Sequence, residues 1–195
     1  DGFGPGFNGP LVVTATFDGS PDLEPLTALA TALGDTPGVA EVVGPIPNDM
    51  ADPTKADAFL FRVIPATSPQ DGRTQQLIDD LRVDTIPTAV DGTALTVHVT
   101  GNVAVFHDFT AYLSERMPLF IGVVLALSFL LLMAVFRSLL VPLKAVVMNM
   151  LSIGAAYGIV VAIFQWGWMG SAFGIAGGPI EPFLPMMMFA IVFGL

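Results

Sequence analysis

Residues 118–136, PLFIGVVLALSFLLLMAVF, decide how the rest of the chain is organised. These nineteen residues carry no charge, and Ser128 is the only polar side chain among them. As a helix with a rise of about 1.5 Å per residue they would extend roughly 28 Å, close to the hydrocarbon thickness of a bilayer. A helix buried in a soluble core is the alternative, but such helices are usually shorter and carry a polar stripe. The stretch therefore predicts a transmembrane helix.

A second apolar run, 145–166, follows after a short link and predicts a second transmembrane helix. The link, 137–144, carries Arg137 and Lys144 and no acid. Because cytoplasmic loops are enriched in Lys and Arg, we expect this link to lie in the cytoplasm and residues 1–116 outside the membrane. The two runs then form a transmembrane hairpin.

The chain continues with a Gly-rich segment, 167–181, which predicts a loop on the outer side. The apolar run 182–195 holds only fourteen residues, too few to cross a bilayer, and predicts the start of a third span. Asp1 opens in mid-sequence and the last residue falls inside an apolar run, so we expect the sequence to be a piece of a longer protein.

Charge divides the chain into the same two parts. Residues 1–116 hold sixteen of the seventeen acids and five of the seven Lys and Arg, a net charge of −11, whereas the remainder has a net charge of +1. An acidic soluble part argues against nucleic acid as a partner, because phosphate binding needs clustered cations. There is no cysteine, which excludes disulfides and thiolate chemistry.

Residues 1–100 predict an extracytoplasmic α+β domain. Alternating or β-branched runs predict strands, and apolar residues at helical spacing predict helices. An irregular lead-in, 1–10, precedes them. The expected order is strand 11–17, helix 21–33 with Ser20 as its N-cap, strand 39–43, a loop at 44–57, strand 58–64, helix 73–83 and strand 94–100. This is the split βαβ, ferredoxin-like plan, in which both helices cover one face of a four-stranded sheet.

A connector helix is predicted at 101–117, between this domain and the first span. Gly101 would make the turn out of the last strand, and Asn102 would cap the helix. Apolar residues then recur at helical spacing as far as Met117. We expect this helix to run into the first span, with Pro118 bending it at the membrane interface, so that motion could pass along one rod.

Candidate chemistry is sparse. His98 and His107 match no metal-binding spacing, and no nucleophile motif is present, so we expect no metal site, no cofactor and no catalytic residue. Segment 118–166 contains no Asp, Glu or His, so these spans alone offer no proton relay. Their small and polar residues are more simply read as packing. Gly154 and Gly158 form a Gly-x-x-x-Gly spacing that would admit another helix closely, and Asn149, Ser152 and Tyr157 would hydrogen-bond between helices.

Three stretches resemble a known family: DGFGPGFNGPL before the split βαβ domain, FRSLLVPLKA in the link, and PIEPFLPMMMFAIVFGL at the end. Together they are similar to the mycobacterial membrane protein large (MMPL) family of the resistance–nodulation–division transporter superfamily. The match is to the second half of such a transporter: its second periplasmic porter domain, spans eight and nine, and the start of span ten.

The resemblance implies part of a proton-driven exporter of lipids or other hydrophobic molecules in a bacterial inner membrane. Its partners would be the hydrophobic cargo, membrane lipid and the other half of the same transporter. The resemblance is also compatible with a homo-oligomer. The proton gradient would be its energy source. Two alternatives from the same superfamily are an auxiliary subunit of protein translocation and a lipid-sensing membrane protein. In the family, protons pass through Asp-Tyr pairs, one of which would lie just beyond Leu195.

This resemblance makes a prediction that needs only the gene. Proton coupling requires a buried carboxylate near midspan, and none is available in segment 118–166. We expect an Asp followed by a Tyr within about five codons after Leu195, at the middle of the third span. Sequencing the gene checks this. Codons for apolar residues alone would remove proton coupling from this half and favour the sensor.

Overall fold

The computed structural model describes residues 4–17, 23–52, 55–168, 180 and 183–194. The chain forms two compact units, Asp1–Asp108 and Phe109–Leu195. The boundary between them falls inside one helix, α4 (Asn102–Phe136), which continues without interruption through both. The predicted connector 101–117 and the predicted first span are thus parts of a single 35-residue helix.

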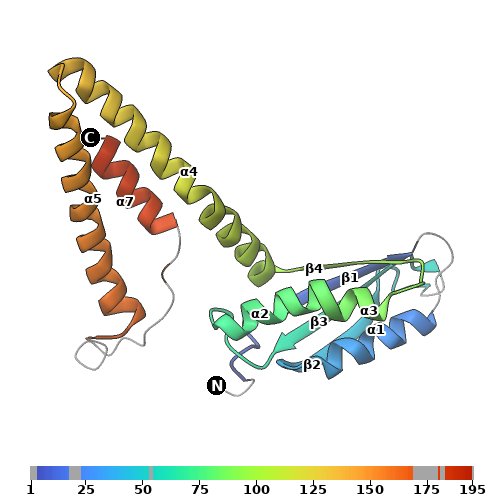
Figure 1. Ribbon diagram of the computed structural model, residues 1–195. Helices are drawn as coiled ribbons and strands as arrows, with labels where there is room; N and C mark the ends of the chain where they lie inside the picture. Colours follow the sequence, from blue (N-terminus) through green and yellow to red (C-terminus); the bar gives the residue numbers. More distant parts are fainter. Residues whose placement is uncertain (1–3, 18–22, 53–54, 169–179, 181–182, 195) are drawn as a thin grey trace. The chain divides into compact units, whose positions relative to one another are not determined.

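The first unit is a four-stranded antiparallel sheet with helices on one face (Figure 1). The strand order β2-β3-β1-β4 places one strand inside each βαβ unit, which confirms the predicted α+β, split βαβ fold. Ser20 and Pro21, at the predicted start of the first helix, lie outside the described residues. The elements in order are β1 (Leu11–Phe17), α1 (Leu23–Asp35), β2 (Val39–Pro47), β3 (Ala58–Pro65), α2 (Gly72–Asp80), η2 (Leu81–Thr85), α3 (Ile86–Ala89) and β4 (Leu95–Thr100).

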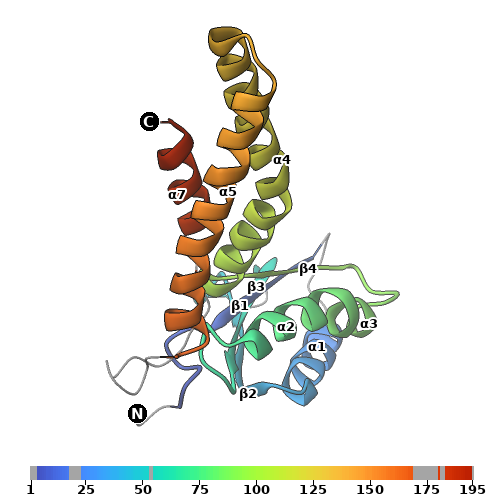
Figure 2. The same ribbon diagram turned by 60° about the vertical axis from the view of Figure 1, so that its left-hand side comes forward.

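The core of this unit lies between the sheet and its helices. In β1 every second side chain is buried, from Leu11 to Phe17, because successive residues of a strand point to opposite faces. Phe61 of β3 and Leu29 of α1 are completely buried in the same cluster. Figures 1 and 2 both show α1 and α2 against this one face. Ala104, in the first turn of α4, is also fully buried there, so the core extends beyond residue 100.

Strand β2 is longer than predicted, because it continues through Gly44 instead of ending at Val43. Its pairing with β3 shifts between Val43 and Ile46. Gly44 has φ +140° and lies so close to β3 that an added Cβ would meet the Leu60 carbonyl at 2.7 Å. Only glycine fits this combination, so a residue read as a loop signal serves as the bulge that keeps an edge strand paired.

The second predicted helix, 73–83, also extends further than expected. Asp71 caps α2 by accepting the Arg73 N–H at 2.9 Å, and the Arg73 side chain holds the pKa of this carboxyl at about 2. Beyond Asp80 the chain makes one π-helical turn, η2, in which the Ile86 N–H donates to the Leu81 carbonyl. Pro87 follows immediately, and a widened turn accommodates a ring that would clash with a carbonyl four residues back.

The second unit is helical. After α4 come α5 (Leu140–Val160), the π-helical turn η3 (Val161–Gln165) and α7 (Phe183–Gly194). Two helical stretches, Asn102–Phe136 and Leu140–Gln165, are long and apolar enough to cross a membrane. Hardly any of their most apolar windows is buried within the chain. A core helix of a soluble protein would be mostly buried, so this exposure favours a lipid or protein environment around them.

The link between these two helices is shorter than predicted. Helix α4 ends at Phe136 and α5 begins at Leu140, so Lys144 lies within α5 and not in the turn. Pro142 explains why the sequence suggested a longer link: it stands in the first turn of α5, where a missing N–H costs no hydrogen bond. The predicted third span, 182–195, contains α7, and most of the predicted outer loop, 167–181, lies outside the described residues.

The packing of the first unit predicts how it unfolds. Expressed as residues 1–108, it should give one cooperative thermal transition. Phe61→Ala should lower the free energy of unfolding by about 3–5 kcal/mol, because it leaves a cavity between sheet and helices. Val43→Ala, at a side chain that is 41% exposed, is the control and should change it little. Chemical denaturation followed by circular dichroism measures both. Equal effects would contradict the core described here.

Candidate functional site

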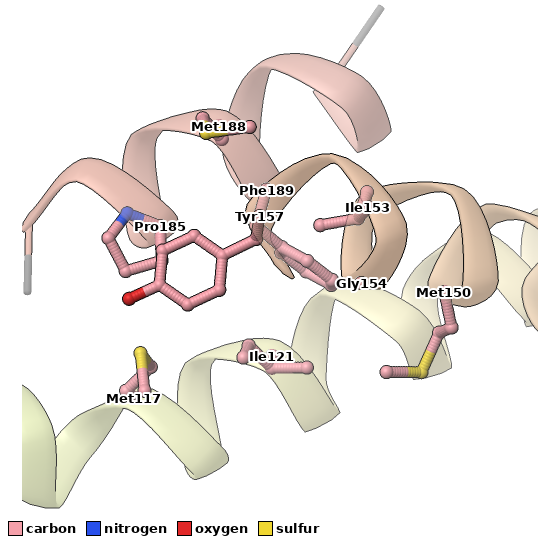
Figure 3. Close-up of a pocket in the computed structure, with 9 residues that line it drawn as sticks. All are labelled: Met117, Ile121, Met150, Ile153, Gly154, Tyr157, Pro185, Met188 and Phe189. Carbon is pink, nitrogen blue, oxygen red and sulfur yellow. The ribbon is translucent and has the colours of Figure 1, made fainter. Parts of the chain in front are cut away.

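An apolar cavity of about 190 Å³ lies in the helical unit, between α4, α5 and α7 (Figure 3). All three helices contribute side chains to its wall. The lining residues are Met117 and Ile121 of α4; Met150, Ile153, Gly154 and Tyr157 of α5; and Pro185, Met188 and Phe189 of α7. No charged residue is among them.

Small and flexible residues keep this space open. A Cβ added at Gly154 would meet no atom within 4 Å, so glycine leaves room where a larger residue would fill it. Phe189 is almost fully buried and packs edge-on against Phe120 at 6.2 Å between ring centroids, which holds α7 to α4. The three methionines have unbranched, flexible side chains that adapt to guests of irregular shape.

The chemistry of the cavity is that of a binding site for apolar groups. Its one side-chain hydroxyl belongs to Tyr157, whose ring extends from α5 into the space between the helices (Figure 3). Apolar cavities of roughly 150 Å³ take up small apolar ligands. A cavity of this kind offers no nucleophile and no general base, but it can accept a hydrocarbon group.

Tyr157, for which the sequence predicts a hydrogen bond between helices, lies in the cavity wall with Gly154, and that hydrogen bond stays a prediction. Asn149, Ser152 and Gly158 are not among the lining residues. A Cβ at Gly158 also meets no atom within 4 Å, so no described helix approaches it closely. Close packing of another helix on the Gly154–Gly158 face therefore stays a prediction for segments beyond those described.

Gly101 and Asn102, predicted as the turn and the cap of the connector helix, lie where β4 ends and α4 begins. Gly101 has φ +102°, and a Cβ there would lie 3.2 Å from the Pro10 carbonyl oxygen. Its own carbonyl accepts the Val105 N–H at 2.9 Å, so Gly101 takes the capping position that we expected for Asn102, and the helix begins at Asn102 itself. Pro118 lies inside α4. The bend expected there stays a prediction.

The two cations of the link lie in different settings. Arg137 is the first residue after α4, with φ +46°, and its N–H still donates to the Met133 carbonyl at 2.8 Å. A non-glycine residue in this left-handed region ends the helix at a cost in backbone energy. Lys144 is exposed on the first turns of α5.

Two polar side-chain contacts hold the beginning of α4 to the rest of the first unit. The Arg82 guanidinium of η2 binds Asp108 through both carboxylate oxygens, with Nη2 2.9 Å from Oδ2, and the same Nη2 donates to the Val99 carbonyl at 3.0 Å. The neighbouring residue, His107, makes the second contact. Its Nε2 lies 3.1 Å from Oδ1 of Asp79, which stands about one turn before Arg82. We call these four side chains the α4 latch: Asp79, Arg82, His107 and Asp108.

The Arg82–Asp108 pair of the latch keeps its charges under ordinary conditions. The hydrogen bonds from Arg82 hold the pKa of Asp108 below its usual value, and the pKa of Arg82 is raised by the same contact. A carboxyl with a depressed pKa contributes its stabilisation above its unfolded pKa and loses it as the pH falls through the folded value. The pair therefore persists down to acidic pH. Because the Asp108 side chain is 52% exposed, we expect a contribution of at most about 1 kcal/mol to stability.

Sequence reasoning missed both the latch and the cavity wall. His107 and Asp108 are neighbours on α4 and contact two different partners, Asp79 and Arg82. Nothing in their spacing indicated Arg82, which lies 26 residues away. Among the described residues no three His, Cys, Asp or Glu side chains are grouped so that they could hold a metal ion.

Comparison with known proteins relates this sequence to a family. The model of the MMPL family matches residues 25–195. A membrane protein of Bacillus subtilis, YdfJ, is 36% identical over the whole chain. The mycolic acid-containing lipids exporter MmpL11 of Mycolicibacterium smegmatis is 31% identical, also over the whole chain. The heme uptake protein MmpL11 of Mycobacterium tuberculosis H37Rv is 32% identical over 98% of the chain. The chain spans 26% of the first of these relatives and 20% of the other two.

Proposed function

Because the chain belongs to the MMPL family of membrane transporters, we propose that it is part of an exporter of lipids or other hydrophobic molecules. The observation that carries this proposal is the cavity between α4, α5 and α7. Two of the three helical segments around it, Asn102–Phe136 and Leu140–Gln165, are long enough to cross a membrane, and its wall is almost entirely hydrocarbon and thioether. Such a wall favours an apolar group over water or an ion, because the Tyr157 hydroxyl is the one polar side-chain group among its lining residues.

The cargo is proposed only as a chemical class. One relative is named for the export of mycolic acid-containing lipids and another for heme uptake. Large apolar surface is common to both molecules. A cavity of about 190 Å³ holds only a part of such a molecule, so it would be one binding site along a longer transport pathway. The rest of that path would belong to the other half of the transporter.

The energy source is proposed to be the proton gradient. Segment 118–166 has no Asp, Glu or His, and the cavity wall contains no ionisable carboxyl or imidazole. These helices can therefore carry cargo but cannot themselves relay protons. Groups outside them, such as an Asp-Tyr pair beyond Leu195, would supply the relay.

The proposed setting is a bacterial inner membrane, with residues 1–116 outside the cytoplasm. Support comes from the cations Arg137 and Lys144, which stand near one end of the hairpin without any acid. The opposite end carries the acidic first unit. This asymmetry follows the positive-inside rule. The other half of the transporter, and further copies of it, are the proposed partners.

Filling the cavity tests the transport proposal. In the full-length protein reconstituted in liposomes, Gly154→Leu should place its side chain in the cavity and lower the uptake of a fluorescent acyl lipid about tenfold. Gly122→Leu on α4 is the control, since that position is also open but does not line the cavity. Uptake should require an imposed pH gradient and stop with a protonophore.

Two outcomes of this assay contradict the proposal in different ways. Equal uptake in the two leucine variants would show that cargo does not pass through the cavity. Uptake that persists after the protonophore would exclude the proton gradient as the energy source, while leaving the cargo assignment in place.

Orientation is tested by cysteine labelling, because this chain has no native cysteine. Ser68→Cys, at an exposed position of the first unit, should react with a membrane-impermeant maleimide on whole spheroplasts. Ser138→Cys, in the turn after α4, should react only with a permeant reagent or after lysis. Labelling of residue 138 from outside would reverse the proposed topology.

A further inference from the structure

The start of α4 is held by a short set of contacts that can be removed one at a time. Val103 and Ala104 pack against the core of the first unit. After these two residues, His107 and Asp108 of α4 make the latch contacts with α2 and η2. Helix α4 then continues to Phe136 with no break. The attachment of α4 to the sheet therefore rests on contacts made in its first two turns.

The geometry of the latch constrains the orientation of the start of α4 more than it adds stability. Arg82 uses both ends of its guanidinium on Asp108 and also reaches the Val99 carbonyl, near the end of β4. One residue thus joins η2, β4 and α4. A bidentate pair fixes relative orientation as well as distance, since the two planar groups must face each other. The contact from His107 to Asp79 adds a second point one helical turn along η2 and α2.

The widened turn η2 places Arg82 for this contact. A π-helical turn contains one more residue than an α-helical turn, so it shifts the direction of the side chains that it carries. Arg82 is the second residue of η2, and Asp79 is in the last turn of α2. Single π-helical turns are frequent at functional sites, and this one carries the arginine that binds α4.

We propose that Arg82 is a positioning residue that couples α4 to the sheet unit, so that α2, β4 and the start of α4 move as one body. Without the bidentate contact the apolar packing at Ala104 remains, but the helix can pivot about it. The proposal concerns how α4 is held and does not require that the protein be a transporter. Its failure would leave the proposed function standing.

Distances between two spin labels test the coupling. The full-length protein in nanodiscs, with other cysteines removed, carries labels at Thr96→Cys on β4 and Ser114→Cys on α4, both exposed positions. Double electron–electron resonance gives the distribution of distances between them. Arg82→Gln or Asp108→Asn should broaden that distribution about twofold. Arg82→Lys keeps the positive charge but loses the two parallel N–H donors of the guanidinium, so it should give an intermediate width.

A double variant and a matched control make the test specific. If Arg82 and Asp108 act on each other, Arg82→Gln with Asp108→Asn should be no broader than either single variant. Arg73→Gln removes the other close Arg–Asp pair of the same helix region, with Asp71, which does not reach α4, and should leave the distribution unchanged. A thermal melt shows that each variant is folded.

Two outcomes overturn the proposal. An unchanged distribution in both Arg82→Gln and Asp108→Asn would show that apolar packing alone aims the helix. Equal broadening by Arg73→Gln would show a general loosening of the first unit. If Arg82→Gln fails to fold, Asp108→Asn alone decides, because that side chain is half exposed and contributes little to the core.

Discussion

The structure depends on the continuity of α4, one helix that belongs to two environments. Its first turn is part of a water-excluded core, with Ala104 completely buried among the strands and helices of the sheet unit. Its later turns are uncharged and largely exposed to whatever surrounds the chain. An α-helix can make this transition because it satisfies its own backbone hydrogen bonds in either solvent. Any loop at the junction would expose unpaired backbone groups and would loosen the connection.

The start of α4 carries charged residues and its later part carries none, and the two regions therefore have different roles. The latch residue Asp108 comes before the apolar part, and half of its side chain is exposed, so the cost of its charge is low. The cavity begins at Met117, where a charge would be expensive. The first region can set the direction of the helix by polar geometry, and the second can hold a hydrocarbon group by shape. Neither region contains groups that would interfere with the other.

Patterns that repeat along the chain were readable from the sequence, and contacts between distant residues were not. Alternation in β1 and the charge-free run after Pro118 correctly indicated a strand and an apolar helix, because each depends on neighbouring residues alone. The extension of β2 required knowing that Gly44 approaches Leu60, and the latch required pairing Arg82 with Asp108. The cavity was invisible for the same reason: its wall comes from three helices, and Met117, Met150 and Met188 share no sequence spacing.

The turn after α4 connects backbone strain to how the protein is made. Arg137 has φ +46°, a conformation that costs an L-residue about 1–2 kcal/mol and that glycine would adopt freely. Glycine there would relax the chain but would remove one of the two cations near the tip of the hairpin. If a translocon reads those cations while the hairpin inserts, the strained arginine trades equilibrium stability of the finished fold for fidelity during biogenesis. Thermostability screens would then favour substitutions at this position that cells would reject.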